Sequence, residues 1–455
     1  MHKILNMIVL KFGGTSVGSV ENFYKVASVV NNTKGPKIVV LSAMSGVTNT
    51  LQKIANLLYL SKVHESSLEI ELLNKKYRLV IQNLFKVDKN KNKAYNKLNE
   101  QNNLLLSFLN TSFSENNEKE VLALGEMIST YLFHLLLEEL GQNSNLMSAT
   151  DFMKIDSLGE PQIDYIEGEL RQIINKESSV ETFITQGFVC KNEKNDIDNL
   201  KRGGSDYTAS LIGAALQVEQ IQIWTDIDGM HNNDPRFVDQ TFSVEEISFD
   251  EAAELAYFGA KILHPQSIIP AKEKNIPVLV KNTFKPNAKG TLIHDKANIK
   301  KIRAIAAKDN ITAIKIKSYR MLMAYGFLKK IFEVFEQNET SIDMITTSEV
   351  AVSLTIDDTK KLDNIVQELH GFGNIEVDSD LSIICIAGDL AQNKKGVTSA
   401  IFSCLTNIPI RMISYGGSNY NLSFLVKTTD KISVLNLLNK GLFPQLKNKE
   451  IAFEA

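Results

Sequence analysis

Residues 7–16 read Met-Ile-Val-Leu-Lys-Phe-Gly-Gly-Thr-Ser, an apolar run that ends in a glycine-rich turn. A helical pattern follows at residues 20–30, and a second apolar run follows at 37–42. The same alternation resumes at 181–189 and ends near 290–293. Buried strands that alternate with helices predict an α/β fold, a three-layer αβα sandwich around a mainly parallel sheet.

The composition is that of an ordinary globular protein, with 44% hydrophobic and 23% charged residues in a chain of 455. A net charge of −3 gives no indication of nucleic-acid or membrane-surface binding. Three cysteines, Cys190, Cys385 and Cys404, are too few and too scattered for a disulfide framework or a cysteine-ligated metal site. The sequence shows neither an apolar run of about 20 residues nor a signal-peptide pattern, so we expect a cytoplasmic protein.

We expect two parts, a catalytic domain at residues 1–295 and a regulatory region at 296–455, divided at a polar junction. Residues 61–120 are rich in Lys, Asn, Glu and Leu and predict a helical excursion, mostly at the surface. In the second part, the pattern of residues 326–346 returns about 70 residues later. Each copy predicts a βαββαβ unit, and such pairs serve ligand sensing or dimerisation unless they form only a structural appendage.

The stretch Lys201–Thr208 places two cations before two glycines, a hydroxyl and a carboxylate, and an apolar helix follows. Free N–H groups and the helix dipole favour an anion at such a helix start, where Arg202 could grip it in bidentate fashion. The alternative is a capped surface helix with Ser205 or Asp206 as its cap.

Lys11 stands at the C-terminal end of the first strand, where open α/β sheets bind their ligands. Its charge suits a phosphoryl group during transfer, although the spacing of a Walker A loop is absent. The segment Ser42–Asn49 adds hydroxyls at the same sheet edge. Glu126 is expected in the first turn of a helix, either as a ligand of a substrate ammonium or as a dipole-stabilised surface glutamate.

The segment Ile223–Asp226 ends another buried strand, a polar loop containing Arg236 follows it, and Lys261 lies further along the chain. A loop, an arginine and a lysine beside a strand edge suit the phosphates of a nucleotide. Trp224 is interpreted as a core residue rather than as a platform for adenine.

Four motifs, in this order, resemble those of the aspartate kinases of the amino acid kinase superfamily. They are Lys-Phe-Gly-Gly-Thr-Ser from Lys11, Arg-Gly-Gly-Ser-Asp-Tyr-Thr from Arg202, Trp-Thr-Asp from Trp224 with a later Asp-Pro-Arg, and Phe-Gly-Ala-Lys from Phe258. The resemblance runs from about Ile8 to about Val426 and covers most of the chain.

The C-terminal repeat is similar to tandem ACT domains, in which part of one domain is inserted within the other. The first, ACT1, is expected at about 314–384, and the second, ACT2, at about 300–313 plus 385–455. A short strand at Ala304–Lys308 would then belong with the last repeat.

The resemblance implies phosphorylation of the β-carboxylate of L-aspartate by MgATP to 4-phospho-L-aspartate, the commitment step of lysine, threonine and methionine biosynthesis. Lys11 would stabilise charge on the transferring phosphoryl group, and Asp206 would orient the site. The residues implied to hold aspartate are Thr48, Glu126, Arg202 and Ser205. Those implied to hold ATP are Lys11, Gly13, Gly14, Ser16, Thr225, Asp226, His231, Arg236 and Lys261. Mg²⁺ would travel on the ATP phosphates without a dedicated protein site.

In ACT1 the resemblance implies an effector site for lysine, formed by Met321, Gly326, Phe327, Leu328, Asp343, Thr347, Ser348 and Glu349. Asp343 and Glu349 could pair with the second ammonium, which lysine carries and threonine lacks; two ordinary exposed acids are the alternative. ACT pairing across a homodimer is implied, with a tetramer as a larger assembly, and no nucleic-acid or membrane partner is expected.

Three positions depart from the family pattern, namely Lys201, Cys190 and His231. None of them removes a catalytic group, so we expect them to affect the affinities for substrate and nucleotide rather than the activity itself. The inhibitor's identity and affinity are open too. A catalytically weak or inactive amino-acid sensor with the same fold is the alternative function, against which the presence of Lys11, Glu126 and the other site residues argues. A fusion with homoserine dehydrogenase would need several hundred further residues and a Gly-x-Gly-x-x-Gly unit, and is not expected.

Overall fold

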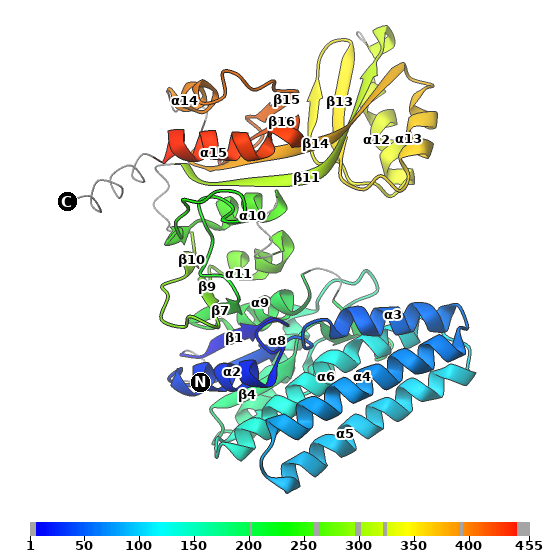
Figure 1. The fold of residues 1–455 in the computed structure, drawn as a ribbon, viewed down its shortest axis with the longest axis vertical. Coiled ribbons are helices and arrows are strands. Elements are labelled where there is room, and N and C mark those ends of the chain that lie inside the picture. Colours follow the sequence, from blue (N-terminus) through cyan, green and yellow to red (C-terminus); the bar gives the residue numbers. More distant parts are fainter. Residues whose placement is uncertain are drawn as a thin grey trace, which may run out of the picture. The chain divides into compact units, whose positions relative to one another are not determined.

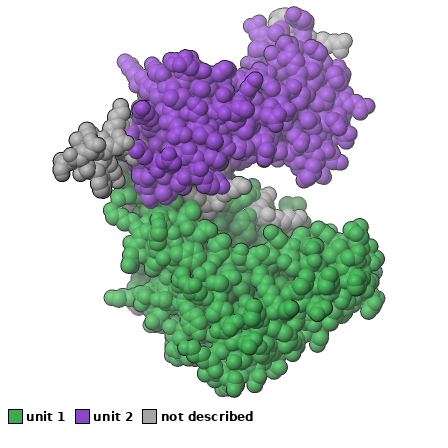
Figure 2. All heavy atoms as spheres, viewed as in Figure 1, with its two compact units in different colours: residues 1–230, 245–249, 263–297 green, residues 231–244, 250–262, 298–455 purple. Residues whose placement is uncertain are grey.

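The computed structural model describes residues 6–200, 203–258, 264–295, 302–321, 325–391 and 395–443. Its contacts divide the chain into two compact units, which are coloured separately in Figure 2. Unit 1 comprises Met1–Met230, Glu245–Phe249 and Leu263–Ala297. Unit 2 comprises His231–Val244, Asp250–Ile262 and Asn298–Ala455.

The sheet of unit 1 has the strand order β3-β4-β2-β1-β7-β9-β10-β8 in the described part of the chain. Neighbouring strands are parallel except β9 and β10, which are antiparallel. This confirms the mainly parallel sheet predicted from the sequence. The strands of unit 1, including a separate β5-β6 hairpin, are β1 (Ile8–Phe12), β2 (Lys37–Leu41), β3 (Ser144–Leu146), β4 (Thr182–Gln186), β5 (Val189–Lys191), β6 (Ile197–Asn199), β7 (Gln220–Thr225), β8 (Glu246–Ile247), β9 (Val278–Asn282) and β10 (Thr291–Ile293).

Helices cover this sheet and extend beyond it as a bundle (Figure 1). Two begin with side-chain caps that satisfy free backbone N–H groups: Ser19 accepts from Asn22, and Ser114 forms a capping box with Asn117. The helices of unit 1 are α2 (Val20–Asn32), α3 (Val47–Tyr59), α4 (Val63–Leu84), α5 (Asp88–Ser107), α6 (Glu115–Glu139), α7 (Ala149–Phe152), α8 (Ile163–Lys176), α9 (Gly204–Leu216) and α11 (Ile269–Glu273), with short 3-10 turns at Phe108–Asn110 and Pro265–Ile268.

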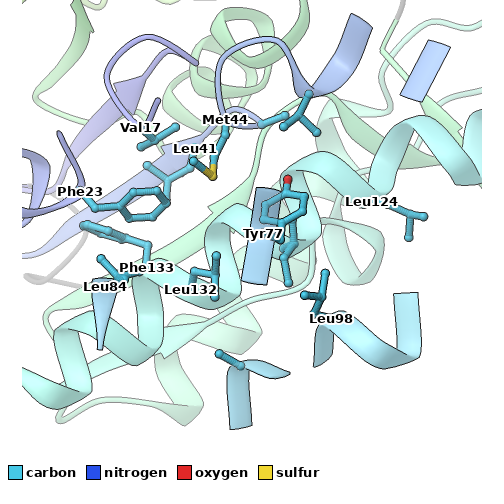
Figure 3. Close-up of a cluster of buried hydrophobic side chains, with 14 of the residues drawn as sticks. Val17, Phe23, Leu41, Met44, Tyr77, Leu84, Leu98, Leu124, Leu132 and Phe133 are labelled. Carbon is cyan, nitrogen blue, oxygen red and sulfur yellow. The ribbon is translucent and has the colours of Figure 1, made fainter. Parts of the chain in front are cut away.

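One core of unit 1 lies between the sheet and the bundle, and Figure 3 shows part of it. Leu10 and Phe12 of β1 point into this core together with Phe23 and Phe133, whose rings are 6.3 Å apart. The helices α4 and α5 bury one face in the same core and leave most of their remaining residues exposed or half-buried, so the excursion is a surface layer with one packed side. Its helical character is confirmed.

The helix α6 is the one described helix that is long and apolar enough to cross a membrane by length and composition alone. Of its most apolar window, 72% is buried inside the protein, which is how the core helix of a globular unit behaves.

The opposite face of β1 carries Val9 and Lys11, because successive side chains of a strand alternate between faces. The apolar helix α9 packs against β1, β2 and β7. Lys11 therefore lies near the end of β1, on the face of the sheet that α9 covers.

Unit 2 contains an antiparallel sheet with the order β12-β13-β11-β14-β16-β15 in the described residues. Its strands are β11 (Ile302–Lys317), β12 (Ile345–Thr347), β13 (Ala351–Ile356), β14 (Asn374–Gly388), β15 (Met412–Tyr415) and β16 (Asn421–Lys427). Its helices are α10 (Phe249–Tyr257), α12 (Phe327–Gln337), α13 (Leu362–Leu369), α14 (Val397–Ser403) and α15 (Lys431–Leu442), with 3-10 turns at Tyr319–Met321 and Thr428–Asp430.

The strands β11 and β14 are shared by both halves of this sheet (Figure 1). The residues Thr312–Lys317 pair with β13, whereas the earlier part of β11 pairs with the end of β14, which continues to β16. The predicted short strand Ala304–Lys308 is thus the first half of a longer one. Separate hydrophobic cores underlie the two halves, as expected for two intertwined ACT domains.

Two segments that precede residue 295 group with unit 2, namely His231–Val244 and Asp250–Ile262. In the first, the side chain of Asn232 donates to Asn439 of α15 at 2.8 Å, and its carbonyl accepts from the N–H of Ile305. The domain boundary at 295 stays a prediction. The compact units are not continuous in sequence, because these two segments before residue 295 pack with unit 2.

Candidate active site

Lys11 and Asp206 form an ion pair at 2.7 Å, with only 11% and 16% of their side chains exposed. Lys11 belongs to β1, and Asp206 lies in the first turn of α9. The turn before the helix needs glycine, because Gly203 and Gly204 have φ values of 71° and 53°. The sequence motif that begins at Lys11 and the one that contains Asp206 therefore meet at one place.

The turns after β1 and β2 approach each other closely. A Cβ on Gly14 would lie 2.9 Å from the carbonyl oxygen of Ala43, too near for any side chain. The carbonyl of Gly14 also accepts a hydrogen bond from the N–H of Ser45 at 3.1 Å. Gly14 thus serves to bring the two loops together, which is a structural reason for its place in the motif.

An open cavity of about 420 Å³ lies where these loops meet the start of α9. Its hydroxyl groups include those of Ser42 and Ser205, which are hydrogen-bonded to each other at 2.9 Å. The lining residues are Gly14, Thr15, Ser42, Ala43, Met44, Ser45, Gly46, Thr48, Asn49, Glu126, Phe188, Gly204 and Ser205. Three predicted substrate residues, Thr48, Glu126 and Ser205, are therefore brought together.

Glu126 is buried, with 4% exposure, and lies in the middle of α6. The expectation that Glu126 opens a helix is wrong, because α6 begins at Glu115. The alternative of a surface glutamate is wrong too, because the side chain is buried. Burial raises the pKa of Glu126 to about 7, opposed by the N–H groups of Ala43 and Glu126 itself and by the charge of Lys11. One of its carboxylate oxygens, Oε2, is buried without a partner in the described part of the chain.

Phe188 also lines the cavity, although no motif in the sequence singled it out. It follows β4 and Gly187, and its backbone has a φ of 69°, which a bulky residue rarely adopts. Its N–H donates to the hydroxyl of Thr208 in α9 at 2.8 Å. The only signal in the sequence is a glycine at the end of a buried strand.

Ser16 is fully buried, and its hydroxyl is within hydrogen-bond distance of the Thr283 hydroxyl at 2.7 Å and of the Trp224 carbonyl at 3.4 Å. Trp224 stacks on Phe12 with ring centroids 5.8 Å apart, which agrees with its interpretation as a core residue. Ser16 holds the loop after β1 against the ends of β7 and β9.

Thr225 and Asp226 follow at the end of β7, where the Thr225 hydroxyl donates to Asp226 at 3.1 Å. The predicted nucleotide residues His231 and Arg236 group with unit 2 instead. Arg236 is 70% exposed and forms a bidentate pair with Asp234, which lowers the pKa of Asp234 against the opposing effect of its burial. The predicted residues Lys201, Arg202 and Lys261 lie outside the described residues.

In unit 2, Asp343 is not an ordinary exposed acid, because its side chain is 1% exposed. It accepts from the Lys308 ammonium at 2.7 Å and from the Tyr257 hydroxyl at 2.8 Å. Lys308 also pairs with Asp357 at 2.9 Å. The two carboxylates raise the pKa of Lys308 against the opposing effect of its burial.

The other predicted effector residues surround the start of α12 and the end of β12. Gly326 caps α12 with a φ of 76°, Phe327 is buried in the core of the first half, and Met321 packs against that core. Thr347, Ser348 and Glu349 are exposed, so the acid pair predicted from the sequence consists of one buried and one exposed carboxylate.

Comparison with known families gives two matches. The model of the amino acid kinase family matches residues 6–282, and a model of the ACT domain matches residues 384–442.

Individual relatives match over nearly the whole chain. Lysine-sensitive aspartokinase 3 of Escherichia coli is 34% identical over 96% of this chain and 99% of its own length. Aspartokinase 1, chloroplastic, of Arabidopsis thaliana is 33% identical over 96% of this chain and 80% of its length. The crystal structure of E. coli aspartokinase III with aspartate and ADP covers 96% of this chain and 100% of that one, with a TM-score of 0.82 and 33% identity. The structure of the same enzyme with lysine and aspartate gives a TM-score of 0.81, with 34% identity over 96% of this chain and 99% of that one.

Proposed function

Because the chain belongs to the aspartokinases of the amino acid kinase family, we propose that its cavity beside Lys11 and Glu126 is the place where L-aspartate meets ATP. The reaction is the ATP-dependent phosphorylation of the aspartate side-chain carboxylate to 4-phospho-L-aspartate. The observation that carries the assignment of the site is the half-buried Lys11–Asp206 ion pair, since Asp206 directly follows Gly204 and Ser205, which line the cavity.

The chemistry requires positioning and charge neutralisation more than a base, since the attacking carboxylate is already ionised near pH 7. Lys11 would follow the phosphoryl group and offset the charge that develops on its oxygens. Asp206 would hold the Lys11 ammonium in place through the 2.7 Å ion pair. A fixed cation in a partly water-excluded site stabilises such charge without reorganising during the reaction.

The substrate would be held by its two ends. Its ammonium would pair with the carboxylate of Glu126, whose free Oε2 suits a further donor. Arg202 would take the α-carboxylate by resemblance, with Thr48 and Ser205 completing the pocket. Ser205 is already set in place by its contact with Ser42.

The nucleotide would lie against the turn after β1 and the end of β7. Gly14 would offer its backbone N–H group, whereas the N–H of Gly13 already donates to the Trp224 carbonyl at 3.3 Å. Thr225 and Asp226 would face the nucleotide from the strand edge, and Gly13 joins the set by resemblance. Ser16 would act by holding this loop to Thr283 rather than through its own hydroxyl. His231, Arg236 and Lys261 join this set by resemblance.

Magnesium would enter as MgATP. No group of three or more His, Cys, Asp or Glu side chains that could hold a metal ion occurs among the described residues. The ion would be held chiefly by the phosphate oxygens, which is how Mg²⁺ is usually carried in kinases.

Lysine would be the feedback inhibitor, with its side-chain ammonium on Asp343. Support comes from the buried carboxylate, which already holds the ammonium of Lys308 at 2.7 Å and keeps Oδ2 without a partner in the described part of the chain. A homodimer through the ACT domains, a tetramer, and a cytoplasmic location stay predictions.

An assay of ADP release with aspartate and MgATP tests the catalytic assignment. We expect turnover that saturates with aspartate and is lost when Lys11 is replaced. Absence of aspartate-dependent turnover at saturating MgATP would favour the amino-acid sensor instead.

A further inference from the structure

The loop His231–Val244 carries His231 and Arg236, two residues assigned to ATP by resemblance, yet it packs as part of unit 2 (Figure 2). The loop is closed at its base by two hydrogen bonds. The N–H of Asn232 donates to the Phe242 carbonyl at 3.0 Å, and the N–H of Phe242 donates to the Asn232 side chain at 2.8 Å. A loop closed in this way moves as one piece, so its position depends on what holds it from outside.

One side chain of α15 holds both arms of this loop. Asn439 accepts a hydrogen bond from the side-chain amide of Asn232 at 2.8 Å on the outgoing arm. It donates to the Gln240 carbonyl at 2.8 Å on the returning arm. Asn233 reaches the same helix, because its amide donates to the Leu435 carbonyl at 3.2 Å. The three asparagines are at most 4% exposed, so these hydrogen bonds are shielded from water.

These buried amides do more than attach the loop to the helix, because apolar contacts already do that. Val238 belongs to the hydrophobic core of the second half of the sheet, and the rings of Phe242 and Phe443 meet edge to face with centroids 5.6 Å apart. Apolar contacts are non-directional, whereas a buried amide needs its partners at defined distances and angles. The amide network therefore specifies one position of the loop on α15.

The residue next to Arg236 is held from the same helix. The carbonyl of Phe237 accepts from the side chain of Asn436 at 3.2 Å, and the Lys431 ammonium lies 4.0 Å from the centre of the Phe237 ring. The Lys431 side chain is 8% exposed and pairs with Asp309 of β11 at 2.6 Å. The Arg236 side chain itself is 70% exposed, so a phosphate can reach its guanidinium while the neighbouring backbone stays fixed.

We propose that Asn439 is a positioning residue for ATP: by holding both arms of the loop His231–Val244 on α15, it sets where Arg236 and His231 meet the nucleotide. Asn436 supports it through Phe237. The helix α15 of the regulatory region thereby serves the affinity for ATP even when no effector is bound. This inference rests on the proposed function, which gives these two loop residues to ATP.

The test replaces Asn439 with leucine, a side chain of similar size without hydrogen-bonding groups, in the full-length enzyme. Asn439→Leu should raise the KM for ATP about tenfold, because the loop no longer has one fixed position. The KM for aspartate and kcat should stay within about twofold, since phosphate binding is lost equally in ground and transition states. A rise of both KM values in the same proportion would show a general distortion and overturn the proposal.

Asn436→Ala is the milder variant, because Asn436 is exposed and its loss leaves the buried network intact. It should raise the KM for ATP about threefold with little change in melting temperature. If Asn439→Leu does not fold, this variant decides the question: an unchanged KM for ATP in Asn436→Ala would overturn the proposal.

Asn338→Leu is the matched control. Asn338 is a buried asparagine at the end of α12, in the other half of the sheet, where its side chain donates to the Val334 carbonyl at 2.8 Å and to Glu368 at 3.1 Å. The control should lower the melting temperature and leave the KM for ATP unchanged. A purely structural role for Asn439 would give this same result with Asn439→Leu, and that outcome would contradict the proposal.

Arg236→Met separates the inference from the function on which it rests. If Arg236→Met leaves the KM for ATP unchanged, the nucleotide role of the loop is wrong and the role of Asn439 falls with it. If Arg236→Met raises this KM but Asn439→Leu does not, only the inference fails. When both raise it, the double variant should show less than the product of the two effects, whereas the full product would show that the two residues act independently.

Discussion

The ammonium of Lys11 lies 2.7 Å from the carboxylate of Asp206, although one residue ends a strand and the other opens a helix. Each group is mostly shielded from water, so neither charge is screened as it would be at the surface. The pair fixes the lysine at the strand end where the phosphoryl group is proposed to pass.

Lys11→Met should lower kcat by about 100-fold or more, because the side chain keeps its length but loses the charge that stabilises the transferring group. Steady-state ADP release at saturating aspartate and MgATP measures the change. Lys53→Met is the control, since Lys53 is an exposed residue of α3 that pairs with Glu69 of α4, and this variant should retain native kcat. A near-native kcat for Lys11→Met would rule out the proposed role.

The KM for aspartate should fall as pH rises through about 7. Burial raises the pKa of Glu126 to about 7, so below this pH the group is largely protonated and neutral and cannot attract the substrate ammonium. Between pH 6 and pH 8 the fall should be about tenfold. Initial rates over a pH series give the profile, and Glu126→Gln should flatten it; the same slope in both proteins would assign the titration to another group.

Gly125→Ala should destabilise the protein by about 1–3 kcal/mol, although alanine normally favours a helix. Its methyl group would lie 2.7 Å from Cβ of Ala43 and 3.3 Å from side-chain atoms of Leu51 and Val47. The displaced helix would also move Glu126 and raise the KM for aspartate. Thermal unfolding provides the stability measurement, with Gly168→Ala in α8 as the control.

Among the described residues, nothing beyond the adjacent backbone of α8 lies within 4 Å of the methyl group that Gly168→Ala would add. That substitution should therefore stabilise the protein by up to about 1 kcal/mol. Equal effects of the two substitutions would show that the contact between Gly125 and Ala43 is not tight.

Lys308→Met should make the enzyme more sensitive to lysine, because it frees the buried Asp343 carboxylate that Lys308 now neutralises. Added lysine should raise the melting temperature of this variant more than that of the native protein, since it replaces a missing charge. Lysine titrations of initial rate give the inhibition constant. Lys317→Met is the control, because Lys317 lies on β11 like Lys308 but forms an exposed ion pair with Glu376 of β14. This variant should have the same inhibition constant as the native enzyme.

Asp343→Ala is the companion variant and should abolish inhibition while the uninhibited kcat stays similar. Persistent inhibition in Asp343→Ala would place the effector elsewhere, whatever the result with Lys308→Met.

Local patterns were sufficient to predict the parallel sheet and the helical excursion, because both follow from apolar periodicity. The rule that ligands bind at strand ends selected Lys11, whereas the relation of Asp206 to Lys11 was implied by the resemblance to the aspartate kinases. The position of Glu126 was predicted poorly, because a glycine before an acid suggests a helix start, whereas Gly125 is needed for close packing against Ala43 in mid-helix.

Partners from distant segments were beyond prediction. Nothing near Asp343 in the sequence indicates that Lys308 and Tyr257 bind its carboxylate, and nothing near Ser16 indicates Thr283. Such contacts depend on how strands are ordered in the sheet, and strand order is a property of the whole chain.

The shared strands of unit 2 have a consequence for how the protein is made. The strand β11 is synthesised early, yet it has no partner until β13 and β14 emerge from the ribosome, and its sheet is not complete until β15 and β16 follow. The first half cannot mature as an independent domain during translation, because β14 ties it to the second. A chain interrupted before β16 would expose the edge of β14, so premature termination here should produce an aggregating species rather than an unregulated enzyme.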